Sequence, residues 1–212
     1  MKQKLLIVVT CFFALLSCKK HITADSDYPD LPAYSEKGLD VSGAHINDST
    51  WLGNNEPSGF SPSIKPVYLT SYPNGDSIEL RLFGSYKSWS IAFEKPSQIS
   101  IVIKGIKIKN DNDLLKLNNQ KYVLDGINNY CKFYKWYDDS LLTKGTGQIQ
   151  FGKIEKNNFI TYGDGSPNNP FLYPYICAAK FELKVVDTIT YNLTHGRFDI
   201  TLLKTSTFSV RE

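Results

Sequence analysis

The chain has 212 residues, with 24 Lys and Arg against 21 Asp and Glu, and a formal net charge of +3 at pH 7. This near balance argues against a nucleic-acid partner, because a phosphate-binding surface needs a clustered excess of positive charge. Aromatic residues make up 13% of the chain, with 13 Tyr against 1 Met, which favours strands over helices.

The first eighteen residues carry a basic start and a short apolar run. Lys2 and Lys4 precede the run from Leu5 to Leu16, which is too short to span a bilayer because a spanning helix needs about 20 residues. The run ends in Leu15-Leu16-Ser17-Cys18, which resembles the lipobox of bacterial lipoproteins. The resemblance implies a signal peptide over 1–17 and acyl chains on Cys18, of which two or three make a stable anchor. An ordinary cleaved signal with an incidental cysteine is the alternative.

This resemblance implies a lipid-anchored protein of the cell envelope, and we expect the outer membrane, with its periplasmic and surface faces both left open. Residues 18–37 contain Ser, Pro and Asp without periodicity, which is typical of a tether. Residues 38–212 are long enough for one domain with a sizeable core. The expected partners are therefore the membrane, through the anchor, and a glycan or another envelope protein.

Short runs of alternating apolar and polar residues follow from Gly38 onward, which is typical of half-buried strands. The clearest are 78–82, 99–103 and 181–185, and Asn74-Gly75 before the first of them is a strong hairpin signal. The other strand-like runs lie at 89–93, 106–108, 122–124, 130–137, 148–154, 159–162, 189–193, 198–202 and 208–210. Many brief strands separated by turns predict an all-β fold, a single antiparallel β-sandwich or barrel-like domain.

Two cysteines remain after the signal and the anchor, Cys131 and Cys177. Outside the cytoplasm such a pair can form a disulfide. Two buried free thiols are the alternative, and the sequence leaves both open.

Four segments together resemble lipoproteins of unknown function found in Bacteroidota. They are Gly43-Ala44-His45-Ile46-Asn47-Asp48 closing on Trp51, Gly147 to Phe151, Ala179 to Leu183, and Thr194-His195-Gly196-Arg197-Phe198-Asp199. The resemblance implies no catalytic residues. Physically, we expect Trp51 to anchor the first strand and Gly196 to take a turn conformation. Arg197 and Asp199 share one strand face, where they can pair with neighbours.

Motifs for catalysis, cofactors and metals are missing from the sequence. It contains no nucleophile elbow, phosphate-binding loop or dinucleotide fingerprint, and nothing selects a pair of carboxylates. His45 and His195 have no companions at metal-ligand spacing. We therefore expect no enzymatic activity, no cofactor and no metal, with an envelope hydrolase as a distant alternative.

Aromatic runs are the remaining lead to a ligand. Trp136 lies in the run 130–137, and Tyr173 and Tyr175 lie in 171–175. Exposed aromatic rings suit sugar faces or a protein partner, so these three residues are candidate ligand contacts, whereas burial in the core is the alternative. The sequence thus predicts a non-catalytic binding or scaffold module, with a carbohydrate-binding surface lipoprotein as the more specific alternative.

Overall fold

The computed structural model describes residues 22–54, 66–86, 97–134, 143–158, 162–163, 165–166, 172–204 and 206–211. Cys18 and Trp136 therefore lie outside the described residues. The strands are β1 (Val41–Ile46), β2 (Ser49–Asn54), β3 (Val67–Tyr72), β4 (Ser77–Tyr86), β5 (Ser97–Lys104), β6 (Lys121–Leu124), β7 (Tyr130–Tyr134), β8 (Thr146–Lys156), β9 (Tyr175–Val186), β10 (Thr190–Leu202) and β11 (Phe208–Val210). Two short 3-10 helices, η1 (Pro73–Gly75) and η2 (Asp111–Leu117), interrupt them. The all-β prediction is confirmed.

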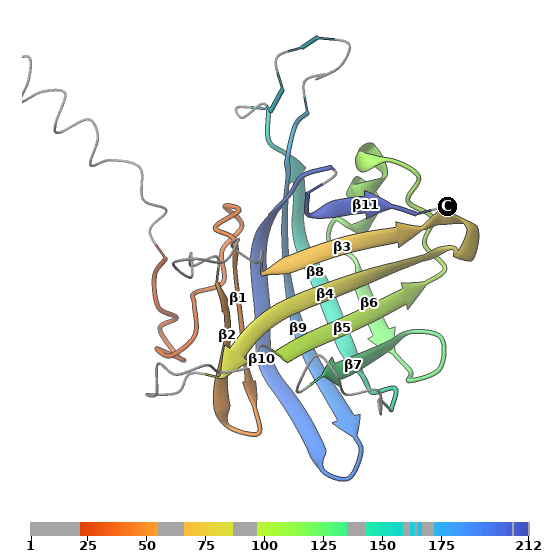
Figure 1. The fold of residues 1–212 in the computed structure, drawn as a ribbon. Helices are drawn as coiled ribbons and strands as arrows, with labels where there is room; N and C mark the ends of the chain where they lie inside the picture. Colours follow the sequence, from red (N-terminus) through yellow and green to blue (C-terminus); the bar gives the residue numbers. More distant parts are fainter. Residues whose placement is uncertain are drawn as a thin grey trace, which may run out of the picture.

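These strands form one curled sheet in the order β11-β3-β4-β2-β1-β10-β9-β8-β6, with β5 on β4 and β7 on β5. The pairing is antiparallel apart from that of β11 with β3, which is parallel. Figure 1 shows β3, β4 and β5 crossing in front of β8 and β9, so the sheet curls back on itself. An isolated bridge between Cys131 and Gly145 ties β7 to the start of β8.

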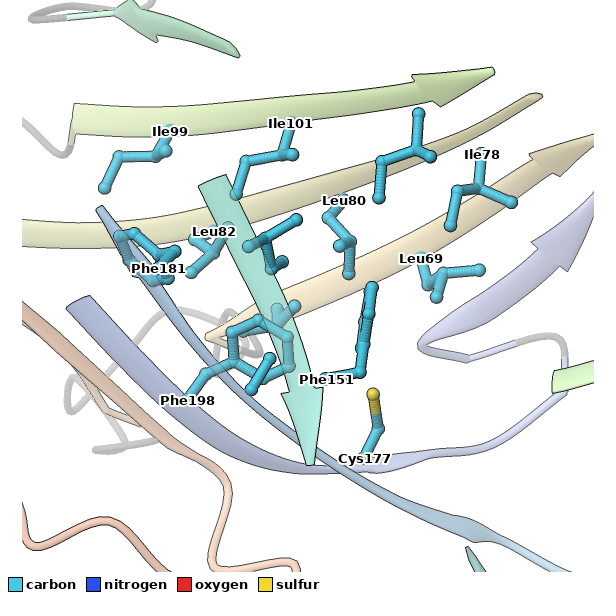
Figure 2. Packing of buried hydrophobic residues seen from close by; sticks show 14 of the residues in the cluster. Leu69, Ile78, Leu80, Leu82, Ile99, Ile101, Phe151, Cys177, Phe181 and Phe198 are labelled. Atoms are coloured by element: carbon cyan, nitrogen blue, oxygen red, sulfur yellow. The ribbon is translucent and has the colours of Figure 1, made fainter. Parts of the chain in front are cut away.

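The core lies inside this curl and follows from the alternation in the sequence. The inward side chains of β4 and β5 are fully buried: Ile78, Leu80, Leu82, Ile99, Ile101 and Ile103. Figure 2 shows the labelled side chains of β4 and β5 facing residues of β8, β9 and β10, which are Phe151, Phe181, Cys177 and Phe198. Each such side chain contributes roughly 1.5–3 kcal/mol when fully buried. Trp51 is fully buried as an anchor of a strand should be, although it lies in β2 and not, as expected, in the first strand.

Strand β10 differs from the sequence-based expectation of two runs, because it is continuous from Thr190 to Leu202. Its pairing with β9 shifts between Leu193 and Gly196, where a β-bulge places an extra residue in the strand. The bulge lets the strand bend without ending. His195 within it has a φ of 54°, a left-handed conformation that residues other than glycine seldom adopt.

The described part of the expected tether is instead folded onto the sheet, so the tether prediction is wrong for residues 22–37. Asp25 N donates to Leu31 O at 3.0 Å, and an isolated bridge joins Ala24 to Pro32. Leu31 is 1% exposed because it packs with Pro32 against Gly43 of β1, where an added Cβ would meet both side chains. We call residues 22–40 the N-terminal strap. Across the described ranges, no helix is long and apolar enough to cross a membrane.

Candidate functional site

A pocket of about 360 Å³ lies between the N-terminal strap and the outer face of β8, β9 and β10. We call it the strap pocket. The strap contributes Asp25, Asp27, Tyr28 and Tyr34, and the strands contribute Gln148, Gln150, Lys180, Phe181, Glu182, His195, Gly196 and Arg197. Its walls therefore come from segments that lie far apart in the sequence, residues 25–34 and 148–197, and the pocket exists only while the strap is in place.

Arg197 fastens the first part of the strap. Its guanidinium NH1 pairs with the carboxylate of Asp25, and its Nε donates to His195 O at 3.1 Å. The side chain of Arg197 is 9% exposed and that of Asp25 is 18% exposed, so this ion pair is partly shielded from solvent. Removing Asp25 would leave the buried guanidinium of Arg197 without its partner, which makes the contact a constraint on the position of the strap.

Asp199, two residues further along the outer face of β10, fastens the end of the strap. Its carboxylate accepts hydrogen bonds from the backbone N–H groups of Lys37 at 3.1 Å, Gly38 at 2.7 Å and Leu39 at 3.3 Å. The hydroxyl of Ser35 donates to the same carboxylate. The expectation that Arg197 and Asp199 share a face is thus confirmed, and their partners belong to the strap rather than to neighbouring strands.

Two histidines meet beneath the middle of the strap. His45 comes from β1 and His195 from the β10 bulge, and their Nδ1 atoms are 3.3 Å apart. The other ring nitrogen of His45, Nε2, is 2.9 Å from Oδ2 of Asp30, which also accepts from the hydroxyl of Thr50. The ring of Tyr28 stacks on that of His195 with centroids 3.9 Å apart. The strap is therefore held by polar contacts along its whole length.

The strap carboxylates are kept ionised by their hydrogen-bond donors. The hydroxyl of Thr50 is the largest influence on the pKa of Asp30 and, with His45, lowers it against the opposing effect of burial. Burial is the largest influence on Asp25 and raises its pKa, but the N–H groups of Asp27 and Tyr28 together with Arg197 outweigh it and leave the pKa lowered. Both groups are negative at neutral pH.

The strap pocket is polar and slightly acidic. Three carboxylates (Asp25, Asp27 and Glu182) face two cations (Lys180 and Arg197), which leaves one excess negative charge when His195 is neutral. The carboxylates of Asp27 and Glu182 form no ion pair with any described residue. Two amide side chains on the β8 wall add both donors and acceptors.

The candidate aromatic contacts do not line this pocket. Tyr175 is 1% exposed and donates its hydroxyl to Asn112 at 2.7 Å, so it is a core residue and the ligand-contact prediction is wrong for it. The reason is that β9 begins at Tyr175 with this side chain inward. Tyr173 is half-buried, with Lys156 Nζ 4.4 Å from the centre of its ring. Trp136 lies outside the described residues.

Cys131 and Cys177 are buried free thiols, so of the two alternatives that the sequence leaves open the structure has the free thiols rather than the disulfide. Cys131 lies next to Gly145, where an added Cβ would fall 2.7 Å from its Sγ and from Val185 Cγ2. Cys177 precedes Val185 by eight residues on the same face of β9, about 26 Å along a strand at roughly 3.3 Å per residue. A disulfide needs Cα atoms within about 7 Å. Burial raises the pKa of Cys131 to about 12 and raises that of Cys177 as well.

In the part of the chain that the structure describes, no three His, Cys, Asp or Glu side chains are grouped to hold a metal ion. The contact between His45 and His195 was not predicted from the sequence, although each lies in one of the four segments that carry the family resemblance.

No protein-family model, curated protein or solved structure matches the chain.

Proposed function

We propose that this protein is a lipid-anchored, non-catalytic binding module of the bacterial cell envelope and that the strap pocket is its ligand site. The observation that carries the proposal is the construction of the pocket, in which buried polar contacts fix the strap against the sheet. The lipobox-like end of the apolar run, Leu15-Leu16-Ser17-Cys18, supports the anchor, and the four segments quoted above support a Bacteroidota lipoprotein.

The chemistry of the pocket supports a carbohydrate as the ligand. Its volume of about 360 Å³ suits a small ligand rather than a protein surface. Gln148 and Gln150 offer both donors and acceptors, and Tyr28 and Tyr34 add ring surface at the strap side. A hydroxyl-rich neutral compound can satisfy this mixture without bringing a charge of its own.

Replacing Gln150 with Ala tests the ligand site. Gln150 is exposed at the pocket wall, so its loss should leave the fold intact and weaken binding of a saccharide found on a glycan array by about tenfold, or roughly 1.4 kcal/mol. Isothermal titration of the soluble domain measures this. Gln120→Ala is the matched control, because Gln120 is also exposed but is not among the residues that line the pocket. Equal binding by both variants would rule out the pocket as the site, and an array without hits would favour the scaffold alternative.

Replacing Cys18 with Ser tests the anchor. The variant lacks the sulfur that would carry the acyl chains, and stable anchoring needs two or three such chains, so the protein should move from the membrane to the soluble fraction. Fractionation and an intact mass measure the change. Cys131→Ser, which removes a buried thiol instead, should stay with the membranes. Sedimentation of the Cys18→Ser variant with membranes would contradict the proposal.

A further inference from the structure

The contact between Asp30 and His45 determines which nitrogen of His45 carries a proton. A carboxylate only accepts hydrogen bonds, and Asp30 Oδ2 lies 2.9 Å from His45 Nε2. A bare nitrogen facing a carboxylate oxygen would bring two lone pairs together. His45 Nε2 therefore carries hydrogen and donates it to Asp30.

The contact between the two histidines then determines the proton position in His195. A neutral imidazole has one N–H, so His45 Nδ1 has only a lone pair to offer. His195 Nδ1, 3.3 Å away, must be the donor of this contact. Because neutral His195 has a single N–H as well, its Nε2 is bare.

We propose that the chain Asp30–His45–His195 fixes His195 as the Nδ1–H tautomer and thereby makes its Nε2 a hydrogen-bond acceptor of the strap pocket, which His195 lines. The acceptor selects for ligands that present a hydrogen-bond donor, such as a hydroxyl or an ammonium group.

The backbone and the strap both fix the orientation of this ring. His195 has a left-handed φ of 54° within a β-bulge, and bulges are a common way to re-aim a side chain near a binding site. Tyr28 covers one face of the ring, with centroids 3.9 Å apart. The orientation of the ring is therefore set by the backbone conformation of His195, by the hydrogen bond with His45 and by the contact with the ring of Tyr28.

The remaining groups of the pocket agree with this class of ligand. A bare His195 nitrogen adds an acceptor to a pocket that Asp27 and Glu182 also line. With Arg197 paired to Asp25, these two carboxylates outnumber Lys180, the remaining cation of the lining. An anionic ligand would meet these acceptors with acceptors of its own. This step rests on the proposed function, and it favours neutral and amino sugars over uronic acids.

Nitrogen-15 NMR of the histidine-labelled protein in detergent micelles at pH 8 tests the tautomer without any ligand. We expect His195 to carry its proton on Nδ1 and His45 on Nε2. His45→Phe keeps a ring but removes the acceptor, so the His195 proton should then populate Nε2. His21→Gln is the control, because it leaves Asp30, His45 and His195 unchanged and should change the signal of neither His45 nor His195. A His195 proton on Nε2 in the unmodified protein would overturn the proposal.

Titration with glucose, glucosamine and glucuronate separates this inference from the proposed function. Glucose and glucosamine should shift the His195 Nε2 signal, whereas glucuronate should leave it in place. If His195 is the Nδ1–H tautomer but its signal responds to none of the sugars, the hydrogen bonds from His195 through His45 to Asp30 are supported and the sugar site is ruled out. A response to glucuronate alone would overturn the ligand selection inferred here.

Discussion

Replacing Asp199 with Ala should detach the end of the N-terminal strap and lower the free energy of unfolding by about 3 kcal/mol, because several hydrogen-bond donors lose a charged acceptor at once. Asp199 is 1% exposed and accepts from the N–H groups of Lys37, Gly38 and Leu39. Gly38 is buried, so water cannot easily replace the carboxylate there. The loss also opens the strap pocket, which should abolish binding at that site.

Urea denaturation gives the change in stability, and amide hydrogen exchange over residues 22–40 reports the release of the strap. Asp187→Ala is the matched control, since Asp187 is an exposed aspartate in the turn between β9 and β10. It should change the free energy of unfolding by less than about 0.5 kcal/mol. Unchanged exchange protection of the strap in Asp199→Ala would show that the carboxylate does not hold it.

Replacing Gly196 with Ala should cost about 2 to 3 kcal/mol, because the new methyl group overpacks the core. An added Cβ would lie within 2.6 Å of Cζ of Phe181, on the neighbouring strand β9. The expected turn conformation of Gly196 is wrong, since the left-handed residue of the bulge is His195. Gly196 is required instead by the aromatic ring packed against it.

A double mutant identifies this cause. Phe181→Leu replaces the aromatic ring with a smaller aliphatic side chain, so Gly196→Ala should destabilise the Phe181→Leu variant less than it destabilises the unmodified protein. Gly75→Ala is the control, because its Cβ would have Ser77 Oγ as its nearest neighbour at an ordinary 3.5 Å. Thermal or urea denaturation of the four proteins measures the coupling, and strict additivity would point to a different source of the strain.

Alternation of apolar and polar residues was sufficient to predict most strands of the core. Ile78, Leu80 and Leu82 are buried as that pattern requires. The strap was missed because no periodic pattern marks it. Its position depends on single contacts with Arg197 and Asp199, more than 150 residues away in the chain, and periodicity carries no information on such partners.

Some residues of the candidate site were predictable from the sequence, but their arrangement was not. The sequence places Arg197 and Asp199 on one face, but not which segment lies over it. The sequence also does not reveal the contact between His45 and His195, because that contact depends on the pairing of β1 with β10 and on the extra residue of β10, which shifts its register with both β1 and β9. Tyr175 was misplaced for a local reason, since β9 begins at that residue rather than after it.

Because the strap is folded, only a very short segment would connect the proposed lipid anchor to the domain. With Cys18 acylated as proposed, its Cα lies four residues from that of Ile22, so the two are at most about 14 Å apart in an extended chain. A twenty-residue tether would let the domain drift far from the bilayer. With the proposed anchor, the domain would stay close to the lipid headgroups, and a pull on the lipid would first load the contacts at the start of the strap, among them the Asp25–Arg197 pair.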